Sequence, residues 1–250
     1  MKKTFLIAVA VLTTTLFSFA QNDDNNWSGT WGGGKKVKGE GAIITQDRAI
    51  SNFTGVESNI SADVFVKQAA AFKVTVEGQK NVLDLMKTEV KNGLLKISFE
   101  KGYSIRYKTQ LKISVEAPSF ERLGMSGSGN VKVEGALTGK NLKLECSGSG
   151  DFDIADLKVS SLDLDISGSG NMKIAGSVDN ADLSISGSGD VKAGNLVVKM
   201  AKCHISGSGN ILCNATEKLD AHVSGSGDIR YKGSPILKSR VSGSGDVRAE

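Results

Sequence analysis

Two histidines, His204 and His222, are the only ones in the chain and the first residues to consider for chemistry. Each stands two residues before a Ser-Gly-Ser-Gly segment, in successive copies of that segment. If the copies stack, the two side chains should project outward, one above the other. Imidazole is a common metal ligand, so the pair is a candidate metal site. The simpler interpretation is two solvated surface histidines, and no cofactor is expected.

Carboxylates and serines could act in catalysis, because an enzyme needs acids or a base that converge in a groove. Asp151 and Asp153, like Asp163 and Asp165, are alternate residues on one face of an expected strand. Such pairs on an exposed strand are typical of surface charge. The many serines lack a base at a matching position, which argues against nucleophilic catalysis. The chain is therefore predicted not to be an enzyme, and a carbohydrate-active or polysaccharide-binding protein is the alternative.

The aspartates that follow some Ser-Gly-Ser-Gly copies raise another alternative, a calcium-binding repeat. Calcium-binding β-helices repeat Gly-Gly-x-Gly-x-Asp, and two such nonapeptides make a coil of about eighteen residues. Here Asp follows Gly directly, and three of the seven copies carry Asn instead. Because calcium prefers several anionic oxygens, this register fits it poorly.

The repeat is the clearest feature of the sequence. Ser-Gly-Ser-Gly-(Asn/Asp) occurs seven times, beginning at Ser126, Ser147, Ser167, Ser186, Ser206, Ser224 and Ser242. A helical repeat needs about 30 or more residues, whereas one coil of a β-solenoid needs about 20. The predicted fold is therefore all-β: a single-stranded parallel β-helix with 18–21 residues per coil in the C-terminal half. The N-terminal half should form wider, irregular coils.

Apolar residues flank every copy with a period of two, which is typical of strands with one buried face. One such column directly follows the Asn/Asp and consists of Val131, Phe152, Met172, Val191, Ile211, Ile229 and Val247. Continued through the motif, the alternation turns both glycines inward and both serines outward. Glycine at such a position allows a sharp bend or a close backbone approach.

The Asn/Asp that ends each motif should face outward and stack at about 4.8 Å per coil. Stacked carboxylates repel, and Asn separates Asp in every step but the last. We interpret this column as a solvated, hydrogen-bonded turn ladder, formed by Asn130, Asp151, Asn171, Asp190, Asn210, Asp228 and Asp246.

The three cysteines, Cys146, Cys203 and Cys213, all fall on inward-facing positions. An odd number leaves at least one cysteine unpaired in an oxidising compartment. We interpret all three as small apolar core residues, and a Cys203–Cys213 disulfide is the alternative.

The N-terminus has the composition of an export signal. Lys2 and Lys3 precede a short apolar run, and Ser18 and Ala20 supply the small residues of a cleavage site. The apolar run is too short to span a bilayer, and no transmembrane segment is expected in the mature chain. The expected organisation is a signal peptide at 1–20, a flexible segment at 21–38 and a β-helix domain at 39–250.

The charge of the chain points away from nucleic acid. The formal net charge of +4 moves closer to zero once Lys2 and Lys3 are removed, and the remaining charges are spread along the chain. No basic patch or stripe forms an electrostatic footprint for a polyanion.

Local patterns also stand out in the N-terminal half. Val56 to Val64 looks like a degenerate copy of the repeat, with Asp63 in the Asn/Asp position. Lys80 to Lys87 predicts a short helix, and Asn92-Gly93 predicts a tight turn.

Together these features resemble the head GIN domain family, described as putative autotransporter adhesins of Gram-negative envelopes. The resemblance rests on the Ser-Gly-Ser-Gly-(Asn/Asp)-Val series, Phe53 to Val56, Ile60 to Val66, Val74 to Gly78 and Leu94 to Ile97. It covers roughly residues 38–250. The resemblance implies a right-handed parallel β-helix at the cell envelope, with no catalytic residues to carry over.

The expected function is a non-enzymatic protein of the envelope or cell surface, an adhesion or scaffold module that presents repeated polar faces. Its partner is expected to be a protein or polysaccharide, and its location the periplasm, the outer-membrane surface or the extracellular space. The last coil exposes a strand edge with Val247 and Ala249. Because uncovered edges invite pairing, weak homo-oligomerisation through the C-terminal coil is also expected.

Overall fold

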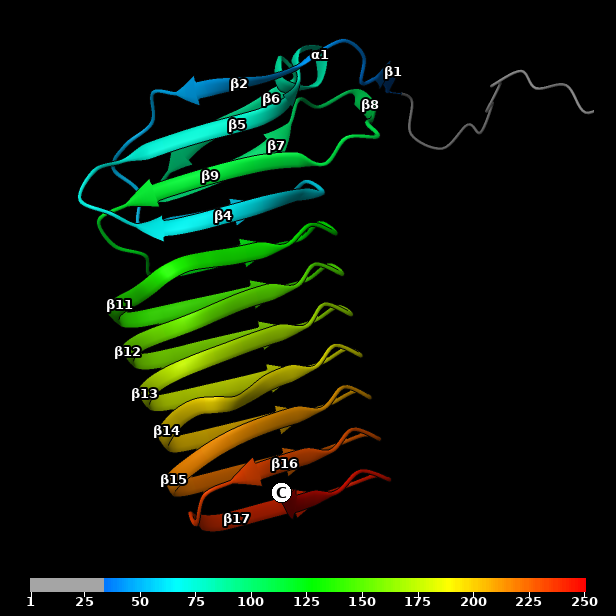
Figure 1. Cartoon of the computed structure of the whole chain (residues 1–250). Coiled ribbons are helices and arrows are strands. Elements are labelled where there is room, and N and C mark those ends of the chain that lie inside the picture. Colours follow the sequence, from blue (N-terminus) through cyan, green and yellow to red (C-terminus); the bar gives the residue numbers. More distant parts are fainter. Residues whose placement is uncertain (1–33) are drawn as a thin grey trace, which may run out of the picture. The chain divides into compact units, whose positions relative to one another are not determined.

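The computed structural model describes residues 34–250, so the expected signal peptide and most of the segment at 21–38 lie outside it. Figure 1 shows the described chain as a stack of coils. Each coil runs along one broad face, turns a corner and returns along the opposite face, and the winding is right-handed. We call the face that follows each Asn/Asp the first face, in front in Figure 1. The face that leads into each Ser-Gly-Ser-Gly is the second face.

The regular part of the stack consists of long strands that cover both faces and the corner between them. They are β11 (Val131–Cys146), β12 (Phe152–Ile166), β13 (Met172–Ile185), β14 (Val191–Ile205) and β15 (Ile211–Val223). The last coil is divided into β16 (Ile229–Lys232), β17 (Ile236–Val241) and β18 (Val247–Ala249).

Neighbouring long strands pair in parallel and in register on both faces. The register shifts only around the corner between the faces, for example between Val133 and Ala136. Coils of different length therefore keep the same columns, because the extra residues are accommodated in these bulges.

Alternate residues of every strand fill a narrow core between the two faces, which confirms the predicted alternation. A second-face column with at most 1% exposure consists of Leu123, Leu144, Leu164, Leu183, Cys203 and Ala221. Burying one leucine side chain contributes about 1.5–3 kcal/mol. The stacked core columns are thus the main source of stability along the coil.

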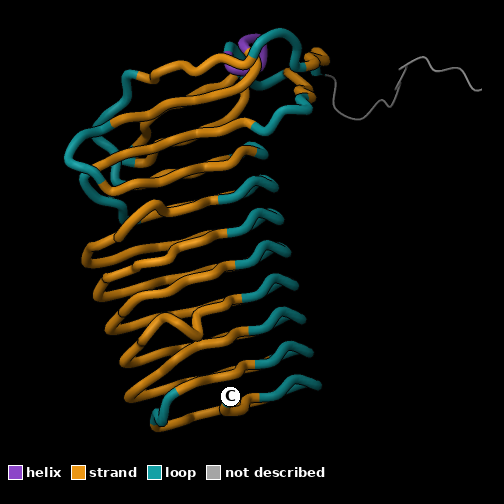
Figure 2. Tube along the Cα trace, in the orientation of Figure 1, coloured by secondary structure: helices purple, strands orange, loops and turns teal. Residues whose placement is uncertain are grey.

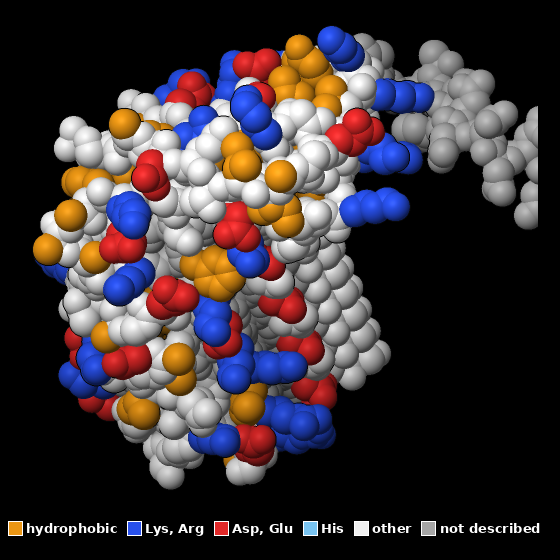
Figure 3. Space-filling view, turned by 45° about the horizontal axis from the view of Figure 1, so that its top comes forward, with side chains coloured by type: hydrophobic (Ala, Val, Ile, Leu, Met, Phe, Trp, Pro, Cys, Tyr) orange, Lys and Arg blue, Asp and Glu red, His pale blue; other side chains and the backbone are white. Residues whose placement is uncertain are grey.

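The Ser-Gly-Ser-Gly corner stacks backbone directly on backbone, as the teal loops of Figure 2 show. The N–H of Ser169 donates to the carbonyl oxygen of Gly148 at 3.0 Å. A Cβ on Gly170 would lie 2.0 Å from the carbonyl oxygen of Gly150 in the coil before. Glycine is needed here because successive coils touch, while the serines remain exposed. In Figure 3 this corner is the uncharged ridge at the right.

The degenerate copy of the repeat forms a coil of its own. β3 (Gly55–Ser58) pairs in parallel with β10 (Arg122–Met125), and β4 (Ala62–Gln68) pairs in parallel with β11. Between β4 and β10 the chain therefore runs to the N-terminal end of the stack and returns.

The intervening residues extend the stack toward the N-terminal end. β7 (Leu94–Phe99) and β9 (Leu111–Ala117) pair in parallel with β3 and β4. Antiparallel strands then cover them: β6 (Met86–Lys91) on β7, β5 (Lys73–Gln79) on β9, and β2 (Ile43–Arg48) on β5. Helix α1 (Lys80–Leu83) buries Val82 and Leu83 at this end. β1 (Lys35–Lys38) and β8 (Tyr103–Arg106) form a separate two-stranded pair.

The N-terminal half differs from the expectation in detail. The helix ends at Leu83 rather than at Lys87, because Met86 and Val90 turn toward the core as part of strand β6. Its antiparallel strands were not indicated by the repeat, and residues 35–38 form β1 rather than part of a flexible segment. The Asn92-Gly93 turn is confirmed, with positive φ at both residues.

Candidate functional site

Two outward columns run along the second face, and their side chains vary from coil to coil. The near column lies two residues before the first serine of each motif, or before Asn59 in the degenerate copy. It holds Glu57, Gly124, Glu145, Asp165, Ser184, His204, His222 and Arg240. The far column lies two residues earlier and holds Arg122, Lys143, Asp163, Asp182, Lys202, Asp220 and Lys238. The repeat fixes where these side chains stand, but not what they are.

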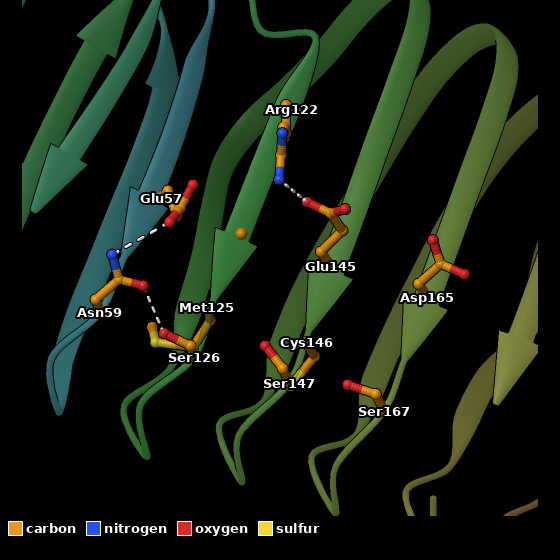
Figure 4. Close-up of a pocket in the computed structure, with 11 residues that line it drawn as sticks. Glu57, Asn59, Arg122, Met125, Ser126, Glu145, Cys146, Ser147, Asp165 and Ser167 are labelled. Carbon is orange, nitrogen blue, oxygen red and sulfur yellow. Dashed lines mark hydrogen bonds and ion pairs between the residues drawn. The ribbon is translucent and has the colours of Figure 1, made fainter. Parts of the chain in front are cut away.

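Gly124 leaves a hollow in the near column, between Glu57 and Glu145. Figure 4 labels Glu57 and Glu145 with the other side chains that line this hollow. The hollow has a volume of about 240 Å³, and Asp165 and serines of the corner also line it. A Cβ on Gly124 would meet no atom closer than 3.7 Å, the Cγ of Glu57. Its backbone is not left-handed either, so neither packing nor φ requires glycine at this position.

An ion-pair network holds one wall of the hollow. Arg122 pairs with Glu145 (Figure 4), and Lys143 Nζ lies 3.2 Å from Glu145 Oε1 and 3.5 Å from Asp165 Oδ2. The hydrogen bond to Glu145, with the charges of Glu145, Asp163 and Asp165, raises the pKa of Lys143. Exposed pairs of this kind contribute at most about 1 kcal/mol each to stability. Here they hold carboxylates at the rim.

The opposite wall is tied to the serine corner. Asn59 Nδ2 donates to Glu57 Oε1 at 3.2 Å, and Ser126 Oγ donates to Asn59 Oδ1 at 2.6 Å (Figure 4). Glu57 also lies 3.8 Å from Lys96 Nζ. The hollow is thus an opening one side chain wide with a carboxylate on either side. Chemically, it suits a cationic or hydrogen-bond-donating group.

The Asn/Asp residues form a ladder whose polar atoms bond to one another. Both the backbone N–H and Nδ2 of Asn210 donate to Oδ1 of Asp190, at 2.9 and 3.0 Å. The N–H of Asp228 in turn donates to Oδ1 of Asn210 at 3.0 Å. Asp63 begins the ladder, accepting from Asn130 at 3.1 Å. This geometry supports a structural role, and contact between the ladder and a ligand stays a prediction.

His204 and His222 stack on the near column, with ring centroids 5.0 Å apart and ring planes 5° apart. Among residues 34–250, no three or more His, Cys, Asp or Glu side chains are grouped so that they could hold a metal ion. A metal bound by the two histidines alone stays a prediction.

The three cysteines are buried in the core and unpaired. Cys146 Sγ donates to the carbonyl oxygen of Gly150 at 3.2 Å, and burial raises the pKa of its thiol. The hydrogen bond with Cys213, followed by burial, raises the pKa of Cys203. These thiols are core residues that point away from the outward columns of the second face.

Sequence reasoning does not single out Glu57, Gly124 or Glu145, because they lie outside the motif. The signal that could have found them is the position two residues before each motif serine. Gly124 is the one small apolar residue in that column from Glu57 to Arg240. A gap in an otherwise polar column marks a hollow.

Comparison with known proteins decides the family. Residues 52–235 match the model of the family described as putative auto-transporter adhesin, head GIN domain. The chain belongs to this family. No curated protein matches it significantly.

Several solved structures are similar to this chain over most of its length. A putative adhesin from Bacteroides fragilis shares 30% identity with a TM-score of 0.83, over 86% of this chain and all of its own. A putative lipid binding protein from Parabacteroides distasonis shares 27% identity with a TM-score of 0.72, over 86% of this chain and all of its own. A putative adhesin from Parabacteroides merdae shares 24% identity with a TM-score of 0.70, over 86% of this chain and 99% of its own. At this identity the last likeness shows the fold alone.

The family and these neighbours indicate a surface or exported adhesin-like protein with an external partner. Within residues 34–250, no helix has the length and apolar character needed to cross a membrane.

Proposed function

We propose that this head GIN domain protein is a non-enzymatic adhesion or scaffold module of the cell envelope or surface, and that its second face contacts the partner. The hollow over Gly124 carries the proposal. Neither packing nor backbone geometry requires glycine there, and its absent side chain leaves an opening between Glu57 and Glu145. By charge and size the opening fits a cationic side chain of a partner protein.

Bead adhesion tests this proposal. Beads coated with the purified protein are expected to bind envelope or host-cell components from cells that lack the protein. Gly124→Leu fills the hollow, and we expect it to reduce adhesion about fivefold or more, the loss of a central contact. Gly124→Ala, which leaves most of the space open, and Asp153→Lys on the first face are the matched controls. Absence of wild-type adhesion, or full adhesion by Gly124→Leu, would contradict the proposal.

Polysaccharide binding is a second candidate, favoured by the hydroxyl groups beside the hollow. Ser126, Ser147 and Ser167 line it together with Asn59 and the carboxylates. Hydroxyl, amide and carboxylate groups can exchange hydrogen bonds with sugar hydroxyls. A glycan array probed with wild type and Gly124→Leu distinguishes this candidate, because only the wild type should retain a specific glycan.

Self-association through the C-terminal coil also belongs to the proposed function. Every residue of β17 is exposed; Ile236 has 78% and Val241 has 43% of its surface exposed. β17 pairs with β15 on one side, and no pairing on its other side occurs among the described residues. An edge of this kind favours weak pairing with another strand.

A further inference from the structure

The charges of the second face change in order along the stack. In the near column the acidic residues Glu145 and Asp165 come first, Ser184 follows, and the hydrogen-bond donors His204, His222 and Arg240 come last. Protonated or neutral, imidazole has an N–H that can donate to a carboxylate. The near column is therefore an acceptor at one end and a donor at the other.

The far column shows a matching order around the same coil. Asp163 lies one coil before Asp182 and Lys202 one coil after it. Lys143 and Asp220 stand two coils away on the two sides. Residues one or two coils away from the coil of Ser184 and Asp182 thus carry opposite charge, whereas Arg122 and Lys238, three coils away, are both cationic.

This order makes the second face complementary to itself. Consider a second copy that lies face to face with the first, with its coil axis running in the opposite direction. A two-fold symmetry axis then relates the two copies; it runs parallel to the strands and passes through the coil of Ser184. Asp165 then lies opposite the partner's His204, and Asp163 lies opposite the partner's Lys202. One coil further, Glu145 meets the partner's His222, and Lys143 meets the partner's Asp220. Each contact occurs twice, as an isologous interface requires.

The shape of the face follows the same symmetry. Two coils beyond Asp165, the hollow over Gly124 lies opposite the partner's Arg240, the cationic side chain that its flanking carboxylates suit. A second hollow of about 440 Å³ surrounds the axis and includes Ser161 and Asp182 in its lining. Met200, 46% exposed, would there lie opposite the partner's Ser161. A large side chain therefore faces a small one at both positions.

Other registers are less favourable. Moving the axis by half a coil toward either end places Asp163 against the partner's Asp182 or Asp220. The same shifts place Lys143 against the partner's Lys202 or Lys238. Like charges directly opposed are costly at an interface, so the columns select the coil of Ser184. Two like-charge contacts remain about this axis. Asp182 faces its own copy and has Lys202 beside it in each protomer. Three coils out, Arg122 faces the partner's Lys238, and Glu145 pairs with Arg122 within its own protomer.

We propose that a partner of the second face is a second copy of this chain, bound antiparallel and face to face about the coil of Ser184. This inference rests on the proposed function, which assigns the second face to partner binding. The two N-terminal ends point in opposite directions in such a dimer. Contact between copies displayed on two opposing cell surfaces requires this orientation.

The expected dimer is weak and salt-sensitive. The six coil steps from Gly124 to Arg240 span about 29 Å, and the face is about 20 Å wide. Two such faces bury roughly 1,200 Å², the low end for specific interfaces. We expect a dissociation constant on the order of 10–100 μM, rising with ionic strength because the contacts are charged.

Sedimentation velocity with complementary variants tests the dimer. Asp163→Lys alone and Lys202→Glu alone each create two like-charge contacts and should weaken dimerisation about tenfold or more. An equimolar mixture restores opposite charges at both contacts, so it should form heterodimers with an affinity within about threefold of wild type. Asp153→Lys and Lys173→Glu, paired on the first face, are the matched controls and should dimerise normally. Circular dichroism checks folding, and Asp165→Lys with His204→Glu is the second pair of variants.

Three results would overturn the proposal. The first is a wild-type protein that stays monomeric at about 1 mM in low salt, about ten or more times the expected dissociation constant. The second is a dimer whose affinity these substitutions do not change, which would point to pairing at the C-terminal edge. The third is an equimolar mixture of the two variants that does not recover dimerisation. Bead adhesion to cells lacking the protein is independent of all three. Loss of self-association with adhesion retained rejects only the dimer, whereas loss of adhesion rejects the proposed function.

Discussion

Asn171 follows Asp151 in the next coil of the turn ladder and donates two hydrogen bonds to one carboxylate oxygen of Asp151. Its backbone N–H and its Nδ2 lie 2.8 and 3.0 Å from Oδ1 of Asp151. Its own Oδ1 accepts the N–H of Asp190 at 3.2 Å. The amide therefore supplies a donor to the carboxylate before it and an acceptor to the next coil. This is why Asn and Asp alternate.

Asn171→Asp should destabilise the protein by about 1–3 kcal/mol, because it removes the Nδ2 donor and places three carboxylates in a row. Urea unfolding followed by circular dichroism measures the change, and the loss should shrink in acid, where the new carboxyl regains a proton. Asp246→Asn is the reverse control, since it supplies the missing amide over Asp228. Equal stability of Asn171→Asp and wild type at neutral pH would mean that the alternation has another cause.

Gly150→Ala should be among the most damaging small substitutions. Its Cβ would lie 2.0 Å from the carbonyl oxygen of Gly129, so the coils must separate at the corner. We expect a loss of about 3 kcal/mol or more, or failure to fold. Gly124→Ala is the control, with a nearest contact of 3.7 Å and a change within about 1 kcal/mol. Thermal melts of the two variants compare them, and similar melting temperatures would refute the steric account.

The cysteines should react with a thiol reagent only after unfolding. All three have at most 1% of their surface exposed, which keeps the reagent away from the folded protein. Burial raises the pKa of Cys146, and the hydrogen bond with Cys213, followed by burial, raises the pKa of Cys203, whereas this hydrogen bond lowers the pKa of Cys213. Because the thiolate is the reactive form, a raised pKa slows the reaction of Cys146 and Cys203 further, and burial alone protects Cys213. Alkylation and mass spectrometry, with and without guanidinium, count the labels. Three labels per unfolded chain are expected, whereas a single label would indicate a Cys203–Cys213 disulfide.

Association at the C-terminal edge should add species larger than a dimer at high concentration. Leu237→Lys places a charge on the exposed strand β17, which should discourage edge pairing. Multi-angle light scattering should show these larger species for wild type and not for the variant, while the dimer persists in both. Unchanged large species in Leu237→Lys would place the contact elsewhere.

Much of the fold follows from the sequence because the repeat is regular. The spacing of the motifs and the apolar columns beside them predict the coil, the inward cysteines and the stacking of His204 on His222. The N-terminal half was harder to predict. Its antiparallel strands β5 and β6 cover the end of the stack, and pairing between strands far apart along the chain leaves no local periodicity. The segment from Met86 is a strand because tertiary pairing with β7 outweighs its local helical preference.

The sequence by itself determined the coil and the columns, since alternation and glycine spacing act locally and repeat in every turn. Only the tertiary structure showed what the columns become when stacked. Gly124 is a hollow because Glu57 and Glu145, far apart in the chain, stand on either side of it. The order of charges along the second face has the same origin. Each side chain is an ordinary surface residue in the sequence, and stacking at β-sheet spacing turns these residues into a face with two complementary ends.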